Sequence, residues 1–113
     1  MITLWHNPRC AKSREALRLL EERGAQVRLR RYLDEPPTEE ELRQLLRTLG
    51  IGARDLMRTK EARFREAGLS ADDPEDRLIG AMVAHPILIE RPVALRGDRA
   101  VIGRPPEKVL DLV

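Results

Sequence analysis

The sequence predicts an α/β fold in which a mixed four-stranded sheet carries a helical insertion. A short apolar run, an amphipathic segment and a second β-prone run come first, which is the order of a parallel βαβ unit. A Gly97-Asp98 turn joins two β-prone runs near the end and predicts an antiparallel hairpin. The stretch between them has helical periodicity. The length of 113 residues fits one domain, 1–113, with the helical insertion at about 38–85.

Three segments define the predicted βαβ unit. Residues 2–5 are apolar and β-prone, which predicts a buried strand. A helix is expected from about 10 to 23, because an apolar stripe runs along it and Gly24 follows it. Residues 27–32 alternate with a period of two, which predicts a second strand. The stripe of the helix consists of Ala16, Leu17, Leu19 and Leu20.

The insertion is predicted to contain several helices. Thr38 and Glu41 have the spacing of a capping box, and Gly50 ends the helix that they begin. Residues 53–69 are expected to be helical but broken. The Asp73-Pro74 step is expected to start the next helix, with the aspartate as cap and the proline at the first helical position. The apolar faces of the first and last helices are Leu42, Leu45, Leu46 and Leu49, and Leu78, Ile79, Met82 and Val83.

The C-terminal part completes the predicted sheet. Residues 87–95 contain a third strand that is interrupted at Arg91-Pro92. Residues 99–102 form the fourth, antiparallel to the third across the Gly97-Asp98 turn. A last short helix is expected through Val109, Leu110 and Leu112.

Composition restricts the classes of function. A net charge of +2 and only three aromatic residues argue against a nucleic-acid surface, which needs basic charge and base-stacking rings. A single cysteine excludes an internal disulfide and a thiolate zinc cluster. No apolar run approaches the roughly 20 residues of a membrane span, and the first residues lack a signal-peptide pattern. We therefore expect a cytoplasmic monomer that binds no nucleic acid, membrane, metal or organic cofactor.

Cys10 is the predicted centre of the chemistry. It follows the first strand and starts the first helix, where unpaired backbone amides and the helix dipole favour a thiolate. Arg9, Lys12 and Arg14 make its surroundings electropositive, and Ser13 completes a C-x-x-S spacing from which a hydroxyl can donate to the sulfur. A lone cysteine can also be a small buried hydrophobe, but its position and neighbours favour a reactive thiolate.

His6 lies four residues before Cys10, in the loop between the first strand and the first helix. It is either a cation or hydrogen-bond donor that favours the ionised thiol, or a loop histidine that caps the strand. Loop spacing leaves both interpretations open. Because no second cysteine can resolve an oxidised Cys10, an external thiol must complete any redox cycle. Glutathione and a glutaredoxin are the natural donors in a reducing cytosol.

Three arginines have distinctive neighbours. Arg58 lies in a Leu-Met-Arg-Thr-Lys run, and Arg91 and Arg104 each directly precede a proline. Guanidinium groups bind tetrahedral oxyanions through forked hydrogen bonds, so these residues and a helix N-terminus could hold phosphate, arsenate, sulfate or a carboxylate. From spacing alone, an ordinary solvated surface arginine is the favoured interpretation of each one.

Several short motifs together resemble one family. Residues 6–13 read H-N-P-R-C-A-K-S and resemble the H-N-P-x-C-x-x-S loop of the glutaredoxin-coupled arsenate reductases. The Leu-Met-Arg run at 56–58, the segment H-P-I-L-I-E-R-P at 85–92 and Gly-Arg-Pro at 103–105 match further signatures of that family in order. The resemblance covers nearly the whole chain, and the compact C-terminal part resembles a shorter subgroup.

The resemblance implies a thioredoxin/glutaredoxin-like fold and an oxidoreductase. It implies that the Cys10 thiolate attacks arsenate, that Arg58, Arg91 and Arg104 bind the oxyanion, and that His6 and Ser13 keep the thiol ionised. Pro92 would be a cis-proline facing the cysteine. Glutathione would be the co-substrate and glutaredoxin the protein partner.

Two other functions fit the same residues. One is a glutathione-linked thiol oxidoreductase that acts on another substrate. The other is a non-enzymatic redox regulator of the Spx type, which binds RNA polymerase. Many regulators of that type carry C-x-x-C, so Ser13 argues against a dithiol switch here.

Overall fold

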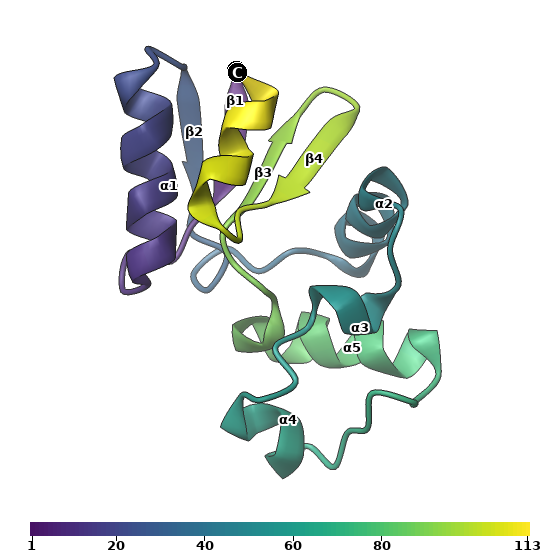
Figure 1. Cartoon of the computed structure of the whole chain (residues 1–113). Coiled ribbons are helices and arrows are strands. Elements are labelled where there is room, and N and C mark those ends of the chain that lie inside the picture. The colour runs from purple at the N-terminus through teal and green to yellow at the C-terminus, as the bar shows by residue number, and fades with distance from the viewer. The chain divides into compact units, whose positions relative to one another are not determined.

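Both ends of the chain contribute strands to one mixed four-stranded sheet in the computed structural model, which describes residues 1–113 (Figure 1). The strands are β1 (Ile2–Trp5), β2 (Val27–Arg30), β3 (Val93–Arg96) and β4 (Arg99–Ile102), in the order β2-β1-β3-β4. β1 pairs with β2 in parallel, and the β1–β3 and β3–β4 pairs are antiparallel. The predicted mixed sheet is confirmed.

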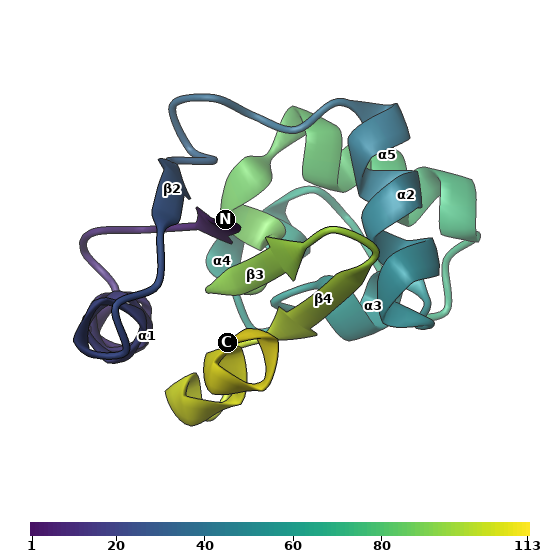
Figure 2. The ribbon, with the colours of Figure 1, turned by 90° about the horizontal axis from the view of Figure 1, so that it is seen from above.

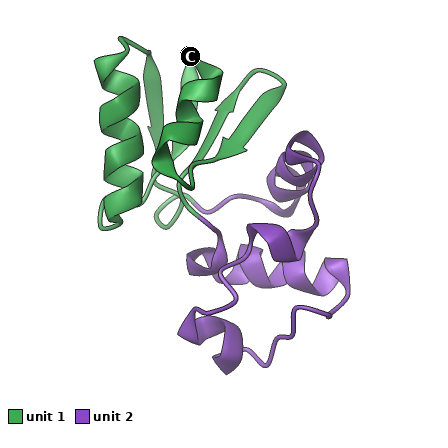
Figure 3. Cartoon of the chain, in the orientation of Figure 1, with its two compact units in different colours: residues 1–35, 91–113 green, residues 36–90 purple.

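The chain divides into two compact units (Figure 3). The sheet belongs to the first unit, which comprises residues 1–35 and 91–113. The second unit comprises residues 36–90 and contains the helices expected at about 38–85. No helix of either unit combines the length and apolar character that a membrane span requires.

Within the first unit, two helices cover one face of the sheet. They are α1 (Ala11–Glu22) and the 3-10 helix η2 (Pro106–Leu112), which lie side by side beneath the strands in Figure 2. Their apolar stripes are buried against alternate residues of β1 and β3. The core of this face consists of Ile2, Leu4, Ala16, Leu20, Ala94, Val109 and Leu112.

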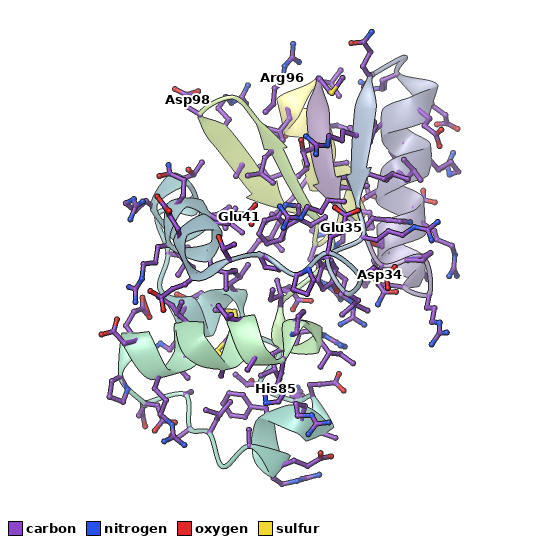
Figure 4. All side chains as sticks on the ribbon, turned by 180° about the vertical axis from the view of Figure 1, so that it is seen from behind. Asp34, Glu35, Glu41, His85, Arg96 and Asp98 are labelled. Atoms are coloured by element: carbon purple, nitrogen blue, oxygen red, sulfur yellow. The ribbon has the colours of Figure 1, made fainter.

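The register of the sheet gathers four connections at one of its ends. Trp5 is paired with Arg30 on one side and with Val93 on the other, and Val93 is paired with Ile102. The residues just beyond these pairs are therefore neighbours at that end: those after β1, β2 and β4, and those before β3. Figure 4 shows Asp34 in the loop after β2 at this end and Asp98 in the β3–β4 turn at the opposite end.

The second unit is helical. It contains α2 (Glu39–Leu49), α3 (Ala53–Leu56), α4 (Ala62–Glu66), α5 (Glu75–Ala84) and the 3-10 helix η1 (Pro86–Leu88). The predicted capping box is present, because Thr38 Oγ1 accepts from the Glu41 amide and the Glu41 carboxylate accepts from the Thr38 amide. Gly50 ends α2 with a φ of 69° in the left-handed region. α2 and α3 both pack on α5.

Two predicted strands are shorter than expected. β2 ends at Arg30 because the amides of Asp34 and Glu35 both donate to the Arg31 carbonyl and turn the chain there. The third strand was expected within 87–95 but begins at Val93. Residues 86–88 form η1, and Ile89 makes only an isolated antiparallel bridge with Met57.

Two helix ends also differ from expectation. Asp73 does not cap α5; its carboxylate accepts from the Ser70 amide and pairs with Arg77, while Pro74 occupies the N-cap position. The last helix is present, but as a 3-10 helix. Both differences arise at short polar or proline-rich segments, where local side-chain bonds compete with the regular helix.

Gly103 allows close packing at the end of the sheet that carries the four connections. Its amide donates to the Pro92 carbonyl at 2.8 Å. A Cβ atom at this position would lie 2.7 Å from Pro92 Cγ and 3.0 Å from Val109 Cγ1. The absence of a side chain therefore sets how closely the segment after β4 approaches the segment before β3.

We expect Gly103→Ala to destabilise the protein by about 1–3 kcal/mol, because the added methyl group must displace the Pro92 ring. Gly80→Ala is the matched control. Gly80 lies within α5, and no atom beyond its chain neighbours and its own helix backbone lies within 4 Å of the place that a methyl group would take, so alanine should stabilise by about 0.5–1 kcal/mol. Urea unfolding of the two variants measures both effects. A Gly103→Ala variant as stable as the wild type would contradict the packing argument.

Candidate active site

Cys10 occupies the N-cap position of α1 and is half-buried. Its amide donates to the Asn7 carbonyl at 3.0 Å, and its carbonyl accepts from the Arg14 amide at 3.0 Å as the first bond of the helix. No side chain caps this end of α1. The thiol therefore lies at the positive end of a helix whose first amides remain available to an anion.

Arg104 lies directly against the sulfur. Its Nη2 atom is 3.9 Å from Cys10 Sγ, and its Nε atom donates to the Arg91 carbonyl at 2.9 Å. The second bond fixes the orientation of the planar guanidinium group, so the cation is held next to the sulfur. An anion that approached the sulfur would meet this cation.

Arg91 and Pro92 form the segment before β3 to which Arg104 is hydrogen-bonded. The Arg91–Pro92 peptide bond is cis, as the resemblance implies for this proline, and the Arg104–Pro105 bond is also cis. Arg91 contributes its carbonyl to Arg104, while its own Nε and Nη1 atoms are shielded from solvent. The sheet register thus brings together Cys10, Arg91 and Arg104, which are distant in sequence.

Side chains hold the loop before Cys10 in one shape. Asn7 Oδ1 accepts from the Arg9 amide at 3.0 Å, and the Asn7 amide donates to Ser13 Oγ at 3.1 Å. Arg14 Nη1 donates to the Pro8 carbonyl at 3.0 Å. Sequence reasoning did not assign roles to Asn7 or to the Arg14 bond, although an Asn-Pro step commonly forms an Asx turn.

Ser13 is fully buried, and its bond joins the helix to the loop. The sequence suggested a hydroxyl donating to the sulfur, but the hydrogen bond that the structure records runs from the Asn7 amide to the Ser13 oxygen. An oxygen that accepts one bond keeps its own proton for donation. That Ser13 stabilises the ionised form of the thiol stays a prediction. The structure shows that its oxygen holds the loop before Cys10.

His6 is buried, with only 4% of its surface exposed. Its amide donates to the Arg30 carbonyl at 2.8 Å, and its Nδ1 atom is buried without a hydrogen-bond partner. Burial lowers the pKa of His6 below its ordinary value, and the positive charges of Arg31 and Arg14 lower it further. Of the two roles suggested for His6 beside the thiol, the neutral hydrogen-bonding group fits this environment better than the cation.

Arg58 belongs to the second unit, where its neighbours are carboxylates. The Arg58 amide donates to the Leu88 carbonyl, and the Glu90 amide donates to the Leu56 carbonyl, so two short segments are bridged. The guanidinium pairs with Glu61 at 2.8 Å and with Glu90 at 3.9 Å. These carboxylates were not singled out from the sequence, although the spacing of Arg58 and Glu61 is that of neighbours on a helix surface. An anion that bound Arg58 would compete with them.

The arrangement suits nucleophilic attack on a bound anion. A half-buried thiol lies at a helix N-terminus, and a fixed guanidinium approaches it from the far end of the sequence. The Arg104 guanidinium can neutralise charge on an oxyanion that the sulfur attacks. No group of three or more His, Cys, Asp or Glu side chains is placed to hold a metal ion.

Comparisons with known proteins agree on one family. A model of the ArsC family matches residues 5–112. The chain is 46% identical over 112 residues to an arsenate reductase of Neisseria meningitidis, a match that covers 96% of this chain and 94% of the relative. It is 39% identical over 113 residues to an arsenate reductase of Escherichia coli, covering 99% of this chain and 80% of the relative. The structure of an arsenate reductase from Vibrio cholerae matches with a TM-score of 0.94 and 42% identity, covering 99% and 97% of the two chains.

The buried His6 predicts how stability depends on pH. Its pKa is lowered from 6.5 in the folded state, so below pH 6.5 the unfolded chain binds a proton that the folded chain does not. Stability is therefore complete above this pH and falls as the pH drops toward the folded-state pKa. Removing the imidazole in His6→Gln should reduce the loss of stability between about pH 7.5 and about pH 5.5.

Urea unfolding midpoints at the two pH values measure this difference. His85→Gln is the matched control, since it removes the other histidine of the chain. An equal reduction of the pH dependence in both variants, or none in His6→Gln, would contradict the role assigned to the burial of His6.

Proposed function

Because the chain belongs to the ArsC family, we propose that it reduces arsenate to arsenite with Cys10 as the nucleophile. The observation that carries the proposal is the contact of the Arg104 guanidinium with Cys10 Sγ at the N-terminus of α1. This contact places a positive charge where an oxyanion must approach the Cys10 sulfur. The names of the relatives support arsenate as that oxyanion.

In the first step the Cys10 thiolate attacks the arsenic atom. A sulfur–arsenic bond forms, one arsenic–oxygen bond breaks, and the oxygen leaves as water after protonation. Arsenic remains in its pentavalent state in this adduct. The Arg104 guanidinium and the amides of α1 neutralise the charge on the remaining oxygens, which is the electrostatic part of catalysis.

In the second step an external thiolate attacks Cys10 Sγ. A sulfur–sulfur bond forms and the sulfur–arsenic bond breaks, with its electron pair moving to arsenic. Arsenic becomes trivalent and leaves as arsenite. Over both steps one arsenate and two thiols give one arsenite, one disulfide and one water. Cys10 is the only cysteine, so the second thiol must come from outside the chain.

We assign the second thiol to glutathione, which is abundant in a reducing cytoplasm. The product on the protein is then a Cys10–glutathione mixed disulfide, and a glutaredoxin reduces it to return the thiol. Neither step uses a bound metal or organic cofactor; glutathione is a co-substrate.

Arg91 belongs to the proposed oxyanion site, because its carbonyl holds Arg104 beside Cys10 at one end of the sheet. Arg58 belongs to the second unit, and the role in oxyanion binding that the resemblance implies for it stays a prediction. Ser13 is a positioning residue in this scheme, because its oxygen holds the backbone of the loop before Cys10. His6 is assigned here, as the resemblance implies, to keeping the thiol ionised.

Cys10→Ser should abolish arsenate-dependent turnover, because an alcohol is not ionised at neutral pH and cannot form the mixed disulfide. The measurement is NADPH oxidation in an assay that couples arsenate, glutathione, glutaredoxin and glutathione reductase. Reactions without arsenate are the control for background oxidation. Absence of turnover in the wild type would reject arsenate reduction, and equal turnover in Cys10→Ser would reject Cys10 as the nucleophile.

Arg104→Lys should lower kcat/KM for arsenate on the order of 10²-fold. An ammonium group keeps the charge but cannot contact the sulfur and the Arg91 carbonyl together in the fixed geometry of a guanidinium. Arg99→Lys is the matched control, since Arg99 lies on β4 and donates to the Asp111 carbonyl at the surface. Equal kinetics for the two variants would contradict the assignment of Arg104.

A further inference from the structure

Residues 7–10 form a β-turn that leads directly into the nucleophile. The Cys10 amide donates to the Asn7 carbonyl at 3.0 Å, which is the bond between the first and fourth residues of such a turn. The peptide that joins Pro8 to Arg9 is then the central peptide of the turn. Turns that share the same closing bond differ in the orientation of this peptide, so the closing bond alone does not fix it.

Two side chains fix the central peptide of the turn. Arg14 Nη1 donates to the Pro8 carbonyl at 3.0 Å, and Asn7 Oδ1 accepts from the Arg9 amide at 3.0 Å. The carbonyl and the amide of a trans peptide point in opposite directions within one plane. The two side chains therefore hold one peptide plane from opposite sides, and a rotation of that plane strains both bonds.

The same arginine also binds the far side of the cysteine. The Arg14 amide donates to the Cys10 carbonyl at 3.0 Å, as the first bond of α1. Through its backbone and its side chain, Arg14 thus contacts the carbonyl before the nucleophile and the carbonyl of the nucleophile itself. The turn and the first turn of the helix are joined into one rigid segment around Cys10.

Stability does not account for the two side-chain bonds. Both lie at the surface, where water can bond to the same carbonyl and the same amide. Loss of either bond would leave no buried polar group without a partner, so its cost in stability is small. The bonds instead set the direction in which the chain enters the half-buried cysteine.

We propose that Asn7 and Arg14 are positioning residues that fix the Cys10 sulfur for its attack on the bound oxyanion. The inference rests on the proposed function and adds two residues to its machinery. Neither side chain is assigned to the substrate; each acts through the peptide plane that they share. A misplacement of about 1 Å at a reacting group can slow a reaction about 100-fold, so a small rotation of the turn is enough to matter.

Steady-state kinetics with arsenate, at saturating glutathione and glutaredoxin, test the assignment. Arg14→Ala and Asn7→Ala should each lower kcat about tenfold and leave the KM for arsenate unchanged, because the sulfur is displaced but the substrate contacts remain. Arg14→Lys and Asn7→Asp should restore most of kcat, since an ammonium group still donates to a carbonyl and a carboxylate still accepts from an amide.

Arg18→Ala is the matched control. Arg18 lies one turn further along α1 and pairs at the surface with Glu15 and Glu22, so its loss should leave both kinetic constants at the wild-type values. A raised KM with unchanged kcat in the Asn7 and Arg14 alanine variants would overturn the proposal. Failure of the lysine and aspartate variants to restore kcat would overturn it as well.

The double variant tests whether the two side chains act on one peptide. Loss of either bond frees the same plane, so the variant with both Asn7→Ala and Arg14→Ala should fall little further than either single variant. A fall of about 100-fold, the product of two independent tenfold effects, would contradict a shared action.

Amide exchange with water, measured by NMR without arsenate, separates this inference from the proposed function. The Cys10 amide closes the turn, so its exchange should be about tenfold faster in Arg14→Ala and in Asn7→Ala than in the wild type and in Arg18→Ala. An unchanged exchange rate would overturn the proposal. Faster exchange in these variants of a protein that does not turn over arsenate would reject the proposed function and keep the hold of Asn7 and Arg14 on the turn.

Discussion

The contact between Arg104 and Cys10 holds the site together. It joins residues near the two ends of the chain, and three features of the fold make it possible. The antiparallel register of β1, β3 and β4 brings the segments beside them to one end of the sheet. Gly103 lets the segment after β4 pack closely on Pro92. The Arg91 carbonyl then orients the guanidinium toward the sulfur.

The charged side chains around the Arg104–Cys10 contact are arginines, which favour the binding of an anion. Burial lowers the pKa of His6, and the positive charges of Arg31 and Arg14 lower it further. The positive potential around the Cys10 loop therefore comes from these arginines and not from the histidine. Arg104 adds a further cation directly beside the Cys10 sulfur.

The sequence predicted the elements and the reactive residue better than it predicted contacts. Hydrophobic periodicity and capping signals located β1, α1 and α2, because these elements are decided by local pattern. Proline-rich and polar segments were less predictable: the chain at 86–90 forms η1 and an isolated bridge, and the Asp73 carboxylate bonds to Ser70. The arginines were identified by their motifs, but only the sheet register explains why Arg104 meets Cys10. The pairing of Arg58 with Glu90 depends on tertiary packing that no local pattern records.

An oxyanion that binds beside the Cys10 sulfur must shield the thiol from alkylation, and this protection can be measured. The rate at which iodoacetamide modifies Cys10 would be determined at neutral pH over a range of arsenate concentrations, with chloride used to hold the ionic strength constant. We predict that arsenate slows alkylation in a saturable manner in the wild type and has little effect in Arg104→Ala. An alkylation rate that is independent of arsenate in the wild type would contradict an oxyanion site at Cys10.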